Sequence, residues 1–268
     1  MARCCKHLPL GYFTNQLSGA SEDWIGVFLG GQYGYVQHGK PVYPEWRDAT
    51  HVAPEPLAPV PEWPLMLGLD FGLTPACIFA QRSPRGQWRV IDELVTEDMG
   101  VVRFGELLAS RLDEWYSDIQ HLEVWGDPAG NARSATDERT CLAIISEKIG
   151  EKCRPAPTND PTTRREAVAQ ALNRMIDGDP GFVLSPSCKV LRKGFAGGYH
   201  YRRARVVGDE RYHDKPDKNA FSHPHDALQY VMLGAGEGRA LVGREKRKRA
   251  GPPPQRANNN YRPQRWRA

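Results

Sequence analysis

The chain has 268 residues, of which 40% are hydrophobic and 25% are charged, as is ordinary for a globular protein of one or two domains. No run of about 18 apolar residues occurs, so a membrane-spanning class is not expected. The basic start is not followed by an apolar segment, and we therefore expect no signal peptide.

The net charge of +4 is unevenly distributed along the chain. Residues 239–268 hold ten Lys or Arg against one acid, a net of +9, so the first 238 residues carry −5. A basic tail of this kind is typical of segments that bind nucleic acid, and its composition predicts disorder. A solvated end without a specific ligand is the alternative. The candidate DNA-binding residues of the tail are Arg244, Lys246, Arg247, Lys248 and Arg249.

Composition divides the rest of the chain into three zones. Residues 1–52 are rich in glycine and aromatic residues and look too short for an independent core. Residues 53–64 contain five prolines, which predict an extended linker. Residues 65–238 carry the alternating pattern of a globular domain.

Within that domain, apolar runs predict strands at 65–70, 76–81 and 88–94. Helical spacing of apolar residues predicts a helix over 101–115, and 122–126 is the fourth expected strand.

Two further helices are expected, one over 137–148 and one that begins at Pro161. Asp160 is the expected N-cap of the second, and Gly178 suits its C-terminal stop. A short strand at 182–184, a β-hairpin over 199–212 that turns near Gly208, and a last helix from about His225 complete the pattern. This order predicts an α/β fold, a mixed sheet with helices on both faces and with the functional site in the loops at strand ends.

Three aspartates stand next to apolar segments that should be buried. Asp70 ends the first strand, Asp127 follows the fourth, and Asp226 lies in the first turn of the last helix, where the helix dipole favours negative charge. If the first and fourth strands are neighbours and the helix crosses their ends, the three carboxylates meet. Converging carboxylates bind hard divalent cations, and a metal pair held in this way is typical of enzymes that cut phosphodiester bonds. Each aspartate alone could equally be structural, as a turn or helix-cap residue.

These segments resemble the C-terminal nuclease part of the large terminase subunit of tailed bacteriophages, which has a ribonuclease-H-like fold. The resemblance covers roughly residues 8–240 and rests on three blocks in order, 68–76, 126–130 and 221–230. Residues 12–51 also look like the exit from the ATPase domain of that family. No Gly-x-x-x-x-Gly-Lys-[Ser/Thr] phosphate loop occurs, so we expect a fragment that does not hydrolyse ATP.

The resemblance implies a metal-dependent endonuclease that cuts concatemeric viral double-stranded DNA during genome packaging. Two Mg²⁺ or Mn²⁺ ions would be held by Asp70, Asp127 and Asp226. The implied partners are double-stranded DNA, the ATPase part of terminase, a small terminase subunit and the portal protein, with no membrane involved. The implied location is the host cytoplasm, with the protein absent from the mature virion.

Four other residues are candidates for supporting roles. His225 neighbours Asp226 and could transfer protons or contact phosphate, although a single histidine is more often a plain hydrogen-bonding residue. Glu93 ends the third strand and could support a metal, with a surface acid as the alternative. Lys215 and Lys218 could contact DNA phosphates, or could be ordinary surface lysines.

Two other functions stay open. Residues 70–74 also resemble the first phosphate motif of the actin and heat-shock chaperone ATPases, although Pro128 removes a backbone donor where their second motif needs one. A non-catalytic DNA-binding adaptor that works through its basic tail is the third possibility. ATP binding would favour the ATPase, and DNA binding without cleavage that survives loss of the three aspartates would favour the adaptor.

Overall fold

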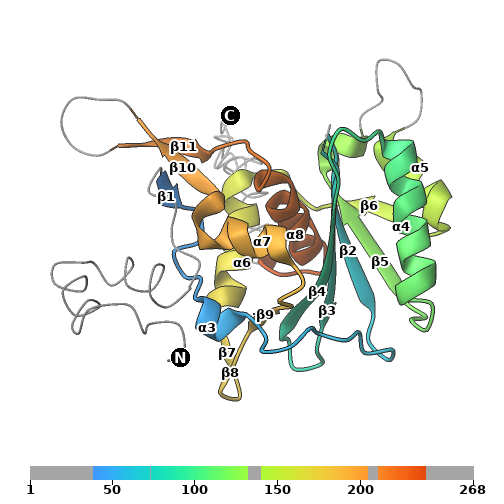
Figure 1. Cartoon of the computed structure of the whole chain (residues 1–268), viewed down its shortest axis with the longest axis horizontal. Helices are drawn as coiled ribbons and strands as arrows, with labels where there is room; N and C mark the ends of the chain where they lie inside the picture. The colour runs from blue at the N-terminus through green and yellow to red at the C-terminus, as the bar shows by residue number, and fades with distance from the viewer. Residues whose placement is uncertain (1–38, 73, 132–139, 205–210, 240–268) are drawn as a thin grey trace, which may run out of the picture.

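A computed structural model describes residues 39–72, 74–131, 140–204 and 211–239 (Figure 1). Its centre is a six-stranded mixed sheet with the order β6-β5-β2-β3-β4-β9. The strands are β2 (Leu65–Asp70), β3 (Ala76–Arg82), β4 (Trp88–Val95), β5 (Leu122–Gly126), β6 (Cys153–Pro155) and β9 (Phe182–Leu184). β2, β3 and β4 form an antiparallel meander, while β5 runs parallel to β2 and β6 parallel to β5. The predicted strands and the mixed sheet are confirmed.

Helices cover both faces of the sheet, as expected for a ribonuclease-H-like fold (Figure 1). Side chains alternate between the two faces along a strand. Leu65, Leu67 and Leu69 of β2 therefore pack under α4 (Val101–Trp115) and α5 (Cys141–Ile149). The other face packs against α8 (Ser222–Gly234), which also contacts α6 (Pro161–Asn173).

The helix boundaries follow the local capping groups. Asp160 caps α6 as predicted, because its carboxylate accepts from Thr163 N at 2.7 Å. The expected stop of that helix at Gly178 is wrong. The helix ends at Asn173, and Gly178 has a φ of 92° in the turn between β7 (Met175–Ile176) and β8 (Asp179–Pro180).

Two other helix starts differ from expectation. α5 begins at Cys141 rather than at 137, because Thr140 is its N-cap and accepts from Ala143 N at 3.1 Å. Residues 137–139 lie outside the described part of the chain. α8 begins at Ser222 rather than near His225, because Ser222 N already bonds to Asn219 O at 3.0 Å.

A second, small sheet lies beside α6 and α7. It has the order β1-β10-β11, with β1 (Gly39–Pro41), β10 (His200–Arg203) and β11 (Tyr212–Pro216). The two strands of the predicted hairpin are present, while its turn lies outside the described residues. The sequence analysis missed α7 (Lys189–Lys193) and the π-helical turn η2 (Gly194–Gly198) that follows it.

The segment before β2 also contributes to the core. Tyr43 and Trp46 are 2% and 3% exposed, and Trp46 stacks on Phe195 with ring centroids 4.3 Å apart. After α3 (Asp48–His51), the proline-rich stretch is anchored by buried Gln81, whose amide bonds both to Val60 N and to Val60 O at 2.8 Å. None of the described helices is long and apolar enough to cross a membrane.

Candidate active site

Two of the three aspartates lie on neighbouring parallel strands. β2 and β5 pair in register, with Leu69 opposite Gly126, so the residues that follow, Asp70 and Asp127, reach the same edge of the sheet. Asp127 N continues the ladder by donating to Leu69 O at 3.1 Å. The expected neighbourhood of the first and fourth strands is therefore confirmed.

α8 brings Asp226 to the same edge through a close backbone contact. A Cβ atom on Gly68 of β2 would lie only 2.1 Å from Ala227 O of α8, so glycine is needed at this position. Asp226 is 2% exposed and is the fifth residue of α8, whereas we expected it in the first turn. It lies deeper because the helix begins earlier than expected.

The two buried aspartates influence each other. Asp70 is 5% exposed, and burial raises its pKa, as does the negative charge of Asp226. The hydrogen bond from His223, whose Nδ1 lies 2.8 Å from Asp70 Oδ2, opposes this rise in the pKa. Asp226 receives Lys218 Nζ on Oδ2 at 2.6 Å and has Arg164 Nη1 at 3.5 Å from Oδ1. Each buried carboxylate thus has a cationic or hydrogen-bonding partner within the chain.

Asp127 is held by neutral donors instead. Its Oδ1 accepts from Ala129 N at 2.8 Å, in the turn that leads into η1 (Pro128–Asn131), and from Asn159 Nδ2 at 3.2 Å. Asn159 Oδ1 in turn accepts from the hydroxyl of Tyr230 at 2.9 Å. Tyr230 lies one turn after Asp226, so this chain of hydrogen bonds connects the loop after β5 to α8.

The arrangement offers carboxylate oxygens, which suit a hard divalent cation, but it is not a closed metal centre. Among the described residues, no three His, Cys, Asp or Glu side chains are grouped so that they could hold an ion. His223 and Lys218 occupy oxygens of Asp70 and Asp226. The assignment of the three aspartates as metal ligands stays a prediction.

The structure places His225 in the core, and it is His223 that contacts a site carboxylate. His225 is fully buried, stacks on Tyr199 with ring centroids 4.8 Å apart, and packs edge-on against Phe195. Burial lowers its pKa to about 3, so its ring is neutral. The helical period could have identified His223, because residues three apart share a helix face and His223 precedes Asp226 by three.

Glu93 has a structural role at the start of α7. Its two carboxylate oxygens accept from Val190 N at 2.7 Å and from Leu191 N at 2.8 Å. Burial raises its pKa, and these two hydrogen bonds oppose the rise. Glu93 therefore caps a helix that the sequence analysis did not predict, which explains why an acid stands at a half-buried strand position.

The candidate DNA-binding lysines lie on the β11 side of the site. Lys215 and Lys218 line a small cavity beside Asp226, together with Arg164 and Arg165 of α6, which the sequence analysis missed. The tail candidates Arg244, Lys246, Arg247, Lys248 and Arg249 lie outside the described residues.

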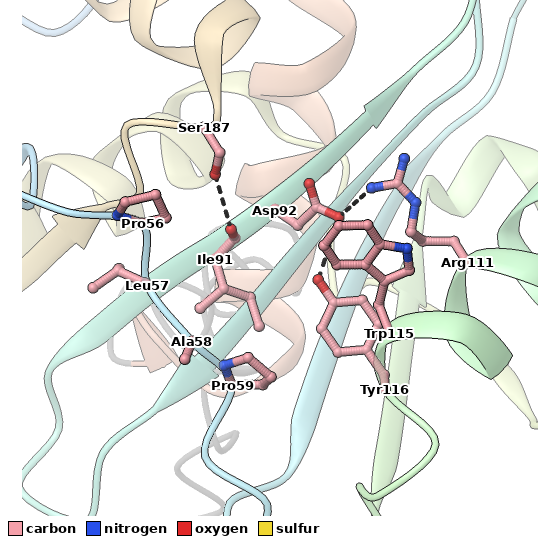
Figure 2. A pocket seen from close by; sticks show the side chains of 10 residues that line it. All are labelled: Pro56, Leu57, Ala58, Pro59, Ile91, Asp92, Arg111, Trp115, Tyr116 and Ser187. Atoms are coloured by element: carbon pink, nitrogen blue, oxygen red, sulfur yellow. Dashed lines mark hydrogen bonds and ion pairs between the residues drawn. The ribbon is translucent and has the colours of Figure 1, made fainter.

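A larger pocket, of about 500 Å³, lies elsewhere, between the proline-rich stretch 56–59 and the end of α4 (Figure 2). Its acid, Asp92, already accepts from Arg111 Nη1 at 2.7 Å and from the Tyr116 hydroxyl at 3.3 Å. Ile91 and Tyr116 belong to the hydrophobic cluster under α4, on the sheet face opposite to α8. This pocket is therefore separate from the three aspartates.

The comparisons with solved structures identify the class of fold. No protein-family model matches the chain, and no curated protein sequence does. The fold is that of ribonuclease-H-like terminase nuclease domains. The nuclease domain of the P22 large terminase superposes with a TM-score of 0.54 at 11% identity, over 78% of this chain and 99% of that one.

The full-length large terminase of a thermophilic bacteriophage gives a TM-score of 0.53 at 19% identity and covers 74% of this chain. This chain spans 46% of that protein, about half its length. The magnesium-bound nuclease of the large terminase from another thermophilic phage, G20c, gives a TM-score of 0.45 at 13% identity, which is too low to bear on this chain. At these identities the likeness establishes the fold alone, and the resemblance inferred from the sequence is confirmed at that level.

Proposed function

We propose that this chain is a metal-dependent endonuclease that cuts double-stranded DNA during viral genome packaging. The observation that carries the proposal is the pair of buried carboxylates, Asp70 and Asp226, brought together from β2 and α8 beside Asp127. Burying two acids side by side is costly for stability, and such strain is typical of functional sites. The likeness of the fold to terminase nuclease domains supports this proposal.

Asp70, Asp127 and Asp226 would hold two divalent cations, Mg²⁺ or Mn²⁺, with Asp70 as the shared ligand. Bound cations of this kind activate a water for attack on phosphorus and stabilise the leaving 3′-oxygen. The three carboxylates supply the negative charge that holds them, and the Asn159–Tyr230 pair fixes the orientation of Asp127.

Lys218 and His223 would exchange partners when substrate binds. Both now neutralise site carboxylates, at 2.6 Å and 2.8 Å. Once a cation takes over that neutralisation, the two side chains are released to bind phosphate oxygens of DNA. The exposed Lys215 would add a further phosphate contact, and the basic tail would add affinity that does not depend on sequence.

In the wider packaging reaction, the partners would be the ATPase part of terminase, a small terminase subunit and the portal protein. The chain would act in the host cytoplasm, on concatemeric DNA. These assignments extend the nuclease proposal and depend on it.

A plasmid-nicking assay tests the proposal. The purified chain should convert supercoiled plasmid to the nicked or linear form with Mn²⁺ or Mg²⁺, and should leave it intact with a chelator. Folded protein that cuts with neither metal would overturn the proposal, and binding of ATP by such protein would favour the chaperone-like alternative.

A further inference from the structure

A small cavity beside Asp226 has an excess of positive charge. Its walls come from the first turns of α6, from α8 and from β11. Four cations, Arg164, Arg165, Lys215 and Lys218, line it against one acid, Asp226. Its volume of about 110 Å³ corresponds to roughly four water molecules at about 30 Å³ each, so it could hold one small oxyanion.

Arg164 is the buried cation of this cavity. Its side chain is 8% exposed, and its Nε and Nη1 atoms have no hydrogen-bond partner among the residues that the structure describes. The nearest carboxylate oxygen, Asp226 Oδ1, is 3.5 Å away, and the guanidinium lies 4.7 Å from the centre of the Tyr230 ring. A buried guanidinium that lacks hydrogen bonds is costly, so these donors favour an incoming acceptor.

The surroundings favour an anionic acceptor. Arg165 is fixed by its own hydrogen bond from Nε to Pro161 O at 2.9 Å and lies 5.3 Å from the centre of the Tyr201 ring. The positive end of the α6 dipole also faces this region, since Pro161, the first residue of α6, lines the cavity. The opposing charge of Asp226 is already compensated by Lys218 at 2.6 Å.

We propose that this cavity binds a backbone phosphate of the DNA substrate, next to the phosphate that is cut at Asp226. Arg164 is the buried donor, since a planar guanidinium presents two parallel N–H groups to a phosphate, and Arg165 and Lys215 flank it. Arg164 contacts both Asp226 and the cavity, and it therefore acts as a positioning residue that sets the distance between a held phosphate and the site carboxylate. This inference rests on the proposed nuclease function and deepens it.

The test is binding of a short fluorescent DNA duplex in the presence of a chelator, measured by anisotropy over a series of salt concentrations. The variants are Arg164→Gln and Lys215→Gln. The matched control is Arg85→Gln, an arginine in the turn between β3 and β4, at the opposite end of the strands, which pairs with Asp177 at 2.7 Å. Each cavity variant should weaken binding several-fold and reduce the slope of log affinity against log salt by about 0.9, the value for one phosphate contact. The control should keep the slope of the unmodified chain.

Two further readouts keep the result interpretable. Lys215 is exposed, so Lys215→Gln should fold even if Arg164→Gln does not. Unchanged slopes in the folded cavity variants would overturn the proposal. Stabilisation by inorganic phosphate that is lost in Lys215→Gln, with unchanged duplex binding, would also overturn the assignment to DNA. Because no metal or cleavage is involved, failure of the nuclease proposal would appear separately, as absence of nicking.

Discussion

At the scale of single residues, each aspartate of the candidate site has a different partner. Asp70 is held by His223, Asp226 by Lys218, and Asp127 by the amide of Asn159. The first two partners can exchange with a metal ion, whereas the neutral amide only orients its carboxylate. Asn159 is therefore the clearest case of a residue that acts by positioning another.

Replacing Asn159 by alanine should reduce nicking by about 10–100-fold, the usual effect of losing a group that orients a metal ligand. The melting temperature should hardly change, because Asn159 is exposed. Cleavage rates and thermal unfolding check the two parts separately. Tyr230→Phe is the matched variant, since it leaves the bond from Asn159 to Asp127 in place and should have the smaller effect. An Asn159→Ala protein that cuts at the normal rate would contradict the role.

The sequence identifies the three aspartates because each stands beside a recognisable apolar run. It does not identify Asn159 or Arg164, because their partners come from segments distant in the chain. His225 was a natural choice from adjacency to Asp226, but neighbours in a helix point in different directions. His223, three residues before Asp226, has the spacing that matters.

At the scale of elements, the contact between β2 and α8 determines whether Asp70 and Asp226 meet. The two backbones touch at Gly68 and Ala227, where an added Cβ would lie 2.1 Å from a carbonyl oxygen. Because that neighbour is backbone, relief requires the helix to shift as a whole. The separation of the two carboxylates thus depends on one glycine that has no polar group.

Gly68→Ala should therefore destabilise the fold by about 1–3 kcal/mol or more, as overpacking of a core does, and should also slow cleavage by moving Asp226. Urea unfolding measures the first effect. Gly100→Ala is the control, since a Cβ there meets nothing within 4 Å. Equal stability of the two variants would show that α8 can move away at little cost.

Strong periodicity and clear caps made most elements predictable, as with the apolar β2 and the Asp160–Pro161 start of α6. α7 and η2 were missed because they are short and contain Gly194, Gly197 and Gly198, which do not favour a helix. The start of α8 was placed too late, since a proline within the first turn is compatible with a helix that has already begun.

At the scale of the whole molecule, Glu237 joins the segment after α8 to the far end of the sheet. It is 6% exposed and accepts from the Trp88 indole at 3.0 Å and from Arg174 at 2.9 Å, with Arg82 at 3.5 Å. Burial alone would raise its pKa. The hydrogen bonds from Arg174 and Trp88, together with the charges of Arg174 and Arg82, outweigh burial and lower the pKa.

A lowered pKa in the folded state means that the unfolded chain binds more protons, so this contribution is present above the unfolded pKa of about 4.3. It is lost as the pH falls through the lower, folded pKa. Glu237→Gln should thus be less stable by about 1.5–3 kcal/mol at pH 7, and the difference should vanish in acid. Unfolding measured between neutral and acidic pH checks this, and a difference that does not depend on pH would contradict it.

The central claim is that the carboxylates at this sheet edge cut DNA, and the most direct measurement compares Mn²⁺-dependent plasmid nicking by three acid-to-amide variants. Asp70→Asn and Asp226→Asn remove charge at the site. Asp177→Asn is the control, because its side chain is 64% exposed and lies in the turn between β7 and β8. We predict that the control cuts like the unmodified chain, and that the two site variants remain folded but fall to the level seen with chelator. Near-normal cutting by folded Asp70→Asn would contradict the account.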